Sequence, residues 1–181
     1  MRWILTLVML VAMSSPAAAQ MVPPPMIEEP KMLIGVSGTV WVPQGDADDF
    51  ADTSIGLRPH FSYRVKPFVA VLATFDYIFV NEIDSVDITY YSVNVGARFI
   101  KPRPGLVEPY GELVLGLHQF EADGFDDSGI GFRLGGGVLY PFGQKLVANL
   151  GINYSSVSID AGLGDVDVNA LIFEIGVGFK L

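Results

Sequence analysis

The segment GELVLGLHQFEADGFDDSGIGFRLGGG, residues 111–137, places charged side chains inside two apolar stretches that flank an acidic patch. Glu112 and His118 lie in the first stretch, and Arg133 lies in the second. The many glycines disfavour a helix, and a strand buried on both faces would not accommodate unpaired charges. Successive side chains of a strand point to opposite faces. The segment therefore predicts two antiparallel strands, each with one apolar face and one polar face.

The last stretch of the chain, VNALIFEIGVGFKL (168–181), shows the same alternation. Its odd positions from Leu171 to Leu181 are all large and apolar, whereas its even positions include Glu174, Lys180 and two glycines. In further segments, too, glycine and charge share one face while apolar side chains form the other. A soluble ligand-binding barrel would have an apolar interior and a more polar exterior. The reversed pattern favours a barrel whose apolar exterior contacts lipid and whose narrow interior is polar.

Eight such segments follow one another, without a convincing helical stripe. They are 32–42, 54–64, 67–80, 87–100, 106–120, 129–141, 145–158 and 167–181. Short turns (RVKP 64–67, KPRPG 101–105 and FGQK 142–145) alternate with longer connections. An even number of strands with short turns on one side and longer loops on the other is typical of outer-membrane barrels. The fold class is therefore predicted to be all-β, an eight-stranded antiparallel up-and-down transmembrane β-barrel over residues 32–181.

Two details of the strands are also predicted. The segment 67–80 is apolar on both faces, and we expect its even positions, including Phe68, Ala70 and Leu72, to point inward. Pro59 and Pro109 lie inside strands and predict a β-bulge at each position, because proline cannot donate to a central ladder.

The N-terminus predicts export from the cytoplasm. Residues 1–20, MRWILTLVMLVAMSSPAAAQ, combine a basic start, an apolar run too short to span a bilayer and an A-x-A site. We expect a signal peptide over residues 1–19 and a proline-rich periplasmic leader over residues 20–31. The chain has no cysteine, which excludes a disulfide framework and thiolate metal sites.

Charge is distributed unequally between the two sides of the predicted barrel. The four longer connections carry fourteen acids and no Lys or Arg: Asp46, Asp48, Asp49, Asp52, Glu82, Asp84, Asp87, Glu121, Asp123, Asp126, Asp127, Asp160, Asp165 and Asp167. The opposite side carries Lys31, Arg64, Lys66, Lys101, Arg103, Lys145 and Lys180. We therefore expect acidic extracellular loops and basic periplasmic turns. The net charge of −9 makes nucleic-acid binding implausible.

On these strands the sequence resembles the small eight-stranded outer-membrane barrels of Gram-negative bacteria, the OmpX/OmpA-type and opacity-protein-like group. The resemblance covers residues 32–181 and rests on the strand count, the PYGELVLGLHQF strand (109–120) and the alternating terminal strand. It differs at the end of the chain, because the family's last residue is usually Phe or Trp, whereas here the chain ends in Leu181. The resemblance implies a location in the outer membrane and assembly by the barrel-assembly machinery. It does not name a function.

The inward-facing polar side chains form the candidate site. The predicted lumen polar network consists of Arg58, His60, Asn94, Arg98, Glu108, Glu112, His118, Arg133, Asn153 and Glu174. Pairing around the KPRPG turn is expected to place Arg98 opposite Glu108 and Asn94 opposite Glu112. A looser register brings Arg133, Asn153 and Glu174 onto adjacent strands. Since an eight-stranded barrel is only just wide enough for side chains to fill, we expect a plug and not a diffusion pore.

Three functions stay open at this point. The first is a non-enzymatic structural or surface protein with no cofactor, and the second is a narrow channel for small or hydrophobic solutes. The third is an outer-membrane lipid-modifying enzyme that uses His60 and Ser62 of the HFS motif. Against this enzyme, Asp76 is expected near the loop end of its strand, too far away to orient His60.

The expected partners follow from location and charge. They are outer-membrane lipid and lipopolysaccharide, bridged by divalent cations, together with an extracellular ligand of the loops and the barrel-assembly machinery. A monomer is expected. Asp46, Asp48, Asp49 and Asp52 are a weak calcium candidate, because their spacing does not fit a twelve-residue calcium loop. Solvated loops are the favoured interpretation, and no metal site is predicted.

Overall fold

The computed structural model describes residues 31–45, 47, 52–83, 86–103, 107–122, 125–160 and 165–181. The predicted signal peptide, residues 20–30 of the predicted leader, and Asp46, Asp48 and Asp49 of the calcium candidate lie outside the described residues. No helix in the described part is long and apolar enough to cross a membrane.

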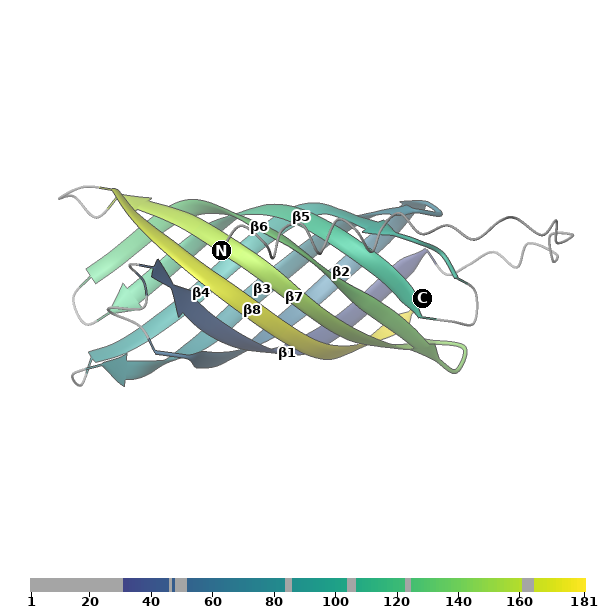
Figure 1. The fold of residues 1–181 in the computed structure, drawn as a ribbon, viewed down its shortest axis with the longest axis horizontal. Helices are drawn as coiled ribbons and strands as arrows, with labels where there is room; N and C mark the ends of the chain where they lie inside the picture. The colour runs from purple at the N-terminus through teal and green to yellow at the C-terminus, as the bar shows by residue number, and fades with distance from the viewer. Residues whose placement is uncertain are drawn as a thin grey trace, which may run out of the picture.

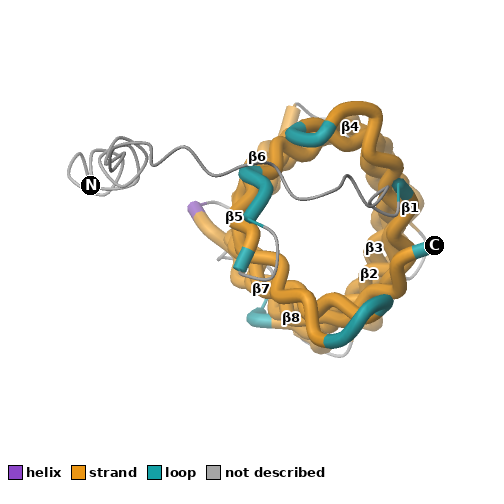
Figure 2. Tube along the Cα trace, turned by 90° about the vertical axis from the view of Figure 1, so that its right-hand side faces the viewer, coloured by secondary structure: helices purple, strands orange, loops and turns teal. Residues whose placement is uncertain are grey.

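Eight antiparallel strands form one closed barrel, in which each strand pairs with its neighbours in sequence (Figures 1 and 2). The strands are β1 (Met32–Gln44), β2 (Ser54–Lys66), β3 (Val69–Ile83), β4 (Val86–Ile100), β5 (Glu108–Ala122), β6 (Phe125–Phe142), β7 (Leu146–Asp160) and β8 (Asp165–Lys180). Pairing of β1 with β8, from Leu33 opposite Lys180 to Gln44 opposite Asn169, closes the barrel. The predicted fold class and strand number are confirmed.

The two ends of the barrel differ in what they contain. The start of β1, the end of β8 and the β2–β3, β4–β5 and β6–β7 connections lie at one end, which we call the turn end. The other four connections lie at the opposite end, which we call the loop end. In the β6–β7 turn Gly143 has a φ of 81°, a conformation that side chains other than glycine rarely adopt.

The strands reach further toward the loop end than the sequence predicted. Pairing continues to Ala122 opposite Phe125 between β5 and β6, and to Asp160 opposite Asp165 between β7 and β8. Eight of the fourteen acids assigned to loops therefore belong to strands: Glu82, Asp87, Glu121, Asp126, Asp127, Asp160, Asp165 and Asp167. The prediction placed the strand ends where the apolar pattern stops, but backbone pairing does not require apolar side chains.

The predicted bulges at the two prolines are wrong. Val36 pairs with Pro59 and Val138 pairs with Pro109, and the register on either side of each proline is unchanged. The shift in the β2–β3 ladder lies instead between Arg64 and Lys66, next to the turn.

The two faces of the barrel have the composition that the alternation predicted. The outer surface is lined by exposed apolar side chains, among them Val93, Val95, Leu115, Leu117, Ile130, Leu134 and Ile175. On β3, Ala70 and Leu72 are buried in the interior, as expected. Phe68 does not follow this pattern and is 54% exposed, because it precedes the first residue of β3 and belongs to the turn.

Candidate functional site

Six ionised side chains meet in the middle of the lumen, and we call them the charged layer: Arg58, Arg98, Arg133, Asp76, Glu112 and Glu174. Each is at most 3% exposed. They come from β2, β3, β4, β5, β6 and β8, so the layer connects strands around most of the barrel. Three positive and three negative charges cancel, which is the condition under which buried ions are tolerated.

Asp76 is the centre of the charged layer. Its carboxylate accepts hydrogen bonds from Arg58 Nε and from Arg133 Nη1, the latter at 2.8 Å. Asn94 Nδ2 and Ser92 Oγ donate to Oδ2 of the same carboxylate at 2.8 and 3.1 Å. One carboxylate thereby joins two arginines that lie 75 positions apart in sequence, from 58 to 133.

Two further groups of contacts complete the charged layer. Glu174 accepts hydrogen bonds from Arg58, from the Tyr110 hydroxyl at 2.8 Å and from Asn149 Nδ2 at 2.9 Å. Arg98 donates to Glu112 Oε2 through Nε at 2.9 Å and Nη2 at 2.7 Å. The Arg98 guanidinium also stacks over the Tyr110 ring, 4.2 Å from its centre.

Glycines on the two following strands, β6 and β7, provide the space for Tyr110. A Cβ atom at Gly137 would lie 2.7 Å from the Tyr110 hydroxyl, and one at Gly151 would lie 2.6 Å from it. Both distances are too short for a real contact, so glycine at these positions lets the tyrosine side chain lie over β6 and β7 and reach Asn149 and Glu174. The abundance of glycine on the inner face therefore reflects the limited width of the barrel.

Apolar side chains lie on both sides of the charged layer. Toward the loop end, an apolar layer is formed by Trp41, Ala47, Ile78, Tyr90, Val157, Ile159, Val168, Ala170 and Ile172, with Phe120 packed against it. Toward the turn end, a second layer is formed by Ala70, Ile100, Tyr110, Leu139 and Val147, with Leu33 packed against it. The charged layer thus lies between two apolar layers, and the turn end also holds an ion pair between Arg64 and Glu108.

All ten residues of the predicted lumen network are buried in the interior. Their predicted pairing is wrong, because Arg98 lies opposite Glu112, and Asn94 lies opposite Gly116. The β4–β5 connection is longer than the predicted KPRPG turn, and Lys101 N–H donates to the Pro109 carbonyl at 2.9 Å. Glu108 consequently lies between the charged layer and the turn end, where it accepts a hydrogen bond from Arg64 at 3.3 Å.

Other members of the network make fewer contacts. Arg133, Asn153 and Glu174 lie on the adjacent strands β6, β7 and β8, as expected, but no hydrogen bond joins them within the described residues. The Asn153 amide is buried and has no hydrogen-bond partner among these residues, and the same holds for Nε2 of His60 and of His118. His118 Nδ1 lies 2.5 Å from the Tyr90 hydroxyl.

Sequence reasoning missed Asp76, Tyr110 and Asn149. Asp76 was expected near the loop end, but β3 continues for seven residues beyond it, to Ile83, so its side chain is 3% exposed in the charged layer. The sequence could have indicated this position, because Asp76 occupies an even position of β3, like the inward-facing Ala70 and Leu72. Tyr110 lies on the same face of β5 as Glu112, but its aromatic ring did not indicate a polar role.

The residues of the enzyme hypothesis do not converge. His60 and Ser62 are each 5% exposed in the lumen wall, so neither reaches the lipid phase. Asp76, the carboxylate considered for orienting His60, is hydrogen-bonded to Arg58 and Arg133 instead. Within the described residues, no group of three His, Cys, Asp or Glu side chains is arranged to hold a metal ion.

The sequence matches the outer membrane protein beta-barrel domain family over residues 4–180. The chain belongs to this family. The predicted family and the location in the outer membrane of a Gram-negative bacterium are thereby confirmed. No curated protein matches the sequence significantly.

Solved structures share the fold at low sequence identity. Neisserial surface protein A (NspA) superposes with a TM-score of 0.68 and 16% identity, covering 83% of this chain and 97% of NspA. The N-terminal β-barrel domain of OprF from Pseudomonas aeruginosa has a TM-score of 0.59, 13% identity and coverages of 84% and 98%. Ail, the attachment invasion locus protein of Yersinia pestis, has a TM-score of 0.58, 18% identity and coverages of 84% and 99%. A second Ail structure, in complex with the heparin analogue sucrose octasulfate, has a TM-score of 0.52, 20% identity and coverages of 83% and 97%.

Proposed function

We propose that this protein is a non-enzymatic outer-membrane barrel with a closed lumen, and that its acidic loop end has a structural or surface-interaction role. The observation that carries the proposal is the three-layered lumen. An ion entering from the loop end would lose its hydration at an apolar layer before it reached the charged layer, and such desolvation costs several kcal/mol. At the turn end, apolar side chains and the Arg64–Glu108 ion pair narrow the entrance to a small pocket. In the charged layer, every carboxylate already has an arginine partner.

The same observation argues against the two alternatives. A narrow channel needs a continuous polar path, whereas here buried apolar side chains form a layer at the loop end of the lumen. A lipid-modifying enzyme needs a nucleophile and a base that reach a lipid, whereas His60 and Ser62 are buried in the wall.

We place the loop end outside the cell and the turn end in the periplasm. Short periplasmic turns and longer extracellular connections are the usual arrangement in this class of barrel. Acidic side chains would then face outward, and they would repel a polyanion such as the sulfated sugar bound to Ail. The expected surface partners are therefore cations, basic surfaces, or phosphate groups that are bridged by a divalent cation.

Lipopolysaccharide is the nearest source of such phosphates. Glu121 and Asp167 lie close to the outer rim of the loop end, where Glu121 accepts a hydrogen bond from the outward-facing Tyr91 at 2.8 Å and Asp167 accepts one from Ser158 at 2.7 Å. These contacts hold two carboxylates at the height of the lipid headgroups. Magnesium between these carboxylates and lipid phosphates would fasten the barrel in its membrane.

The first prediction concerns this bridge. In vesicles that contain lipopolysaccharide, adding magnesium should raise the urea midpoint of unfolding of the wild-type barrel, and a chelator should reverse the rise. The Glu121→Gln, Asp167→Asn variant should lose most of this increase, because amides are weak ligands for magnesium.

Two comparisons make this measurement specific. The Glu108→Gln variant removes an acid at the turn end and should keep the full magnesium effect. An equal magnesium effect in wild type and in the Glu121→Gln, Asp167→Asn variant, or in vesicles without lipopolysaccharide, would contradict the proposed bridge.

A further inference from the structure

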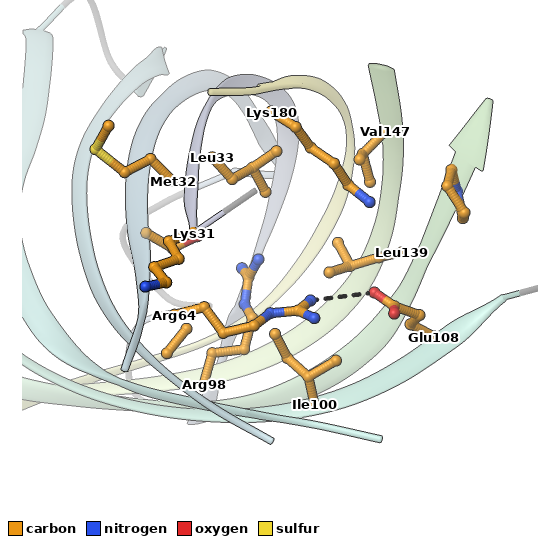
Figure 3. Close-up of a pocket in the computed structure, with 13 residues that line it drawn as sticks. Lys31, Met32, Leu33, Arg64, Arg98, Ile100, Glu108, Leu139, Val147 and Lys180 are labelled. Atoms are coloured by element: carbon orange, nitrogen blue, oxygen red, sulfur yellow. Dashed lines mark hydrogen bonds and ion pairs between the residues drawn. The ribbon is translucent and has the colours of Figure 1, made fainter. Parts of the chain in front are cut away.

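The turn end of the lumen opens into a small pocket that is rich in cations (Figure 3). Its lining includes Lys31, Arg64, Arg98 and Lys180, and among the described residues that line it Glu108 is the only carboxylate. We propose that this mouth pocket binds a phosphate group, supplied either by free phosphate or by a phospholipid headgroup of the inner leaflet. This site goes beyond the proposed function, since it does not depend on whether the lumen is closed or on what the loop end binds.

The backbone pairing brings the cations together. The backbone N–H of Arg64 donates to the Lys31 carbonyl at 2.7 Å. This hydrogen bond fixes Lys31 and Arg64 side by side, at the start of β1 and near the end of β2. Leu33 pairs with Lys180, so β8 brings the third cation to the other side of β1. Three adjacent strands thus each end in a cation at the same opening.

The pocket has more positive than negative charge. Glu108 accepts a hydrogen bond from Arg64 at 3.3 Å, and this ion pair crosses the opening in Figure 3. Within the described residues, no carboxylate lies within ion-pair distance of Lys31 or Lys180. After one acid is paired, two lysine charges are left at the opening, and they favour an anion.

Arg98 has a buried hydrogen-bond donor without a partner in the described part of the chain, which indicates that the pocket can bind a ligand. It lines the pocket, is 2% exposed and uses Nε and Nη2 to bind Glu112. Its remaining nitrogen, Nη1, is buried and has no hydrogen-bond partner among the described residues. An unsatisfied buried donor destabilises a protein, and an oxyanion in the pocket would satisfy it through a charge-assisted hydrogen bond.

The size of the pocket limits what enters it. The space in which a water molecule can be centred is about 30 Å³, and Ile100, Leu139 and Val147 of the apolar layer contribute to the lining. A single small group fits this space, and an extended solute does not. Phosphate offers several oxygens to donors that converge from different strands, and arginine is suited to bind phosphate.

The test is a titration of the refolded wild-type protein in uncharged alkyl maltoside micelles. Sodium phosphate is compared with sodium chloride at equal ionic strength, and the NMR signals of the arginine side chains are recorded. We expect saturable shifts that include the Arg98 signal. The Arg64→Gln, Lys180→Gln variant should bind phosphate at least about tenfold more weakly, since it loses two charge-assisted contacts.

The matched control is the Lys66→Gln, Lys101→Gln variant, which removes the same charge from exposed positions outside the pocket. It should bind phosphate like the wild type. Both double variants are compared at equal folded fractions, and Arg64→Gln alone replaces the pocket variant if that one does not refold. Equal weakening of phosphate binding in both double variants, or an Arg98 signal that moves neither with phosphate nor with the phospholipid described next, would overturn the proposal.

A second titration distinguishes the two sources of phosphate. Short-chain phosphatidylglycerol is added to the same micelles in place of the inorganic salt. Saturation by inorganic phosphate supports a site for the free anion, whereas saturation only by the lipid supports a headgroup site. Saturation by neither ligand would overturn the assignment of the pocket as a phosphate site.

Discussion

Replacing Asp76 with alanine should lower the free energy of unfolding of the barrel by about 3–5 kcal/mol, the usual cost of removing one partner of a buried ion pair. Asp76 accepts hydrogen bonds from both Arg58 and Arg133. Without it, Arg133 would keep only Thr74 at 3.1 Å and the more distant Glu112 at 3.7 Å. Urea unfolding in lipid vesicles, followed by tryptophan fluorescence, measures the loss.

A double-mutant cycle attributes this loss to the ion pair. The Asp76→Ala, Arg133→Ala variant removes both partners and should be less destabilised than the sum of the two single variants, because no uncompensated charge is left at this pair. Asp52→Ala removes an exposed acid and should change stability by no more than about 0.5 kcal/mol. A loss for Asp76→Ala as small as that for Asp52→Ala would contradict the central role of Asp76.

Replacing Leu115 with arginine should destabilise the barrel by about 2–4 kcal/mol, the cost of a lipid-facing cation near the middle of the bilayer. Leu115 lies in the middle of β5, is 63% exposed and faces away from the lumen. Its neighbours on the adjacent strands are Val95 and Phe132, so nothing beside it offers a partner for the charge. The same unfolding measurement in vesicles applies.

The matched control for this variant is Gln119→Arg, on the same strand and the same face. Gln119 lies four residues, or two repeats of the alternating pattern, closer to the loop end, beside Tyr91 of β4. A cation near the interface costs only about 0–1 kcal/mol. If the two variants were equally stable, the apolar outer face would not be the surface that contacts the hydrocarbon core.

The alternation of side chains was sufficient to predict the architecture. The terminal strand alone separates Phe173, Ile175 and Val177 from Glu174 and Lys180, and the structure places these sets on opposite faces of β8. A period of two is a local property, which each strand displays independently of its neighbours. This independence explains why both the strand number and the inward-facing residues could be read from the sequence.

The contacts between strands could not be predicted in the same way. The pairing of Arg98 with Glu112 depends on the length of the β4–β5 connection, and the predicted turn, residues 101–105, is two residues shorter than the observed connection, residues 101–107. The pairing of Arg58 with Glu174 joins β2 and β8, which are remote in sequence and flank β1 only when the barrel closes. Such contacts depend on register and closure, which are properties of the whole sheet.

The most direct test of the closed lumen is single-channel recording of the refolded protein in a planar bilayer, beside the Arg98→Ala, Arg133→Ala variant. The variant leaves Asp76, Glu112 and Glu174 with Arg58 alone, and the unpaired carboxylates should draw water and cations into the lumen. We predict that the wild type is silent and that cation-selective current appears only in the variant. A steady, ion-selective current through the wild-type protein would contradict the closed lumen and identify the barrel as a small channel.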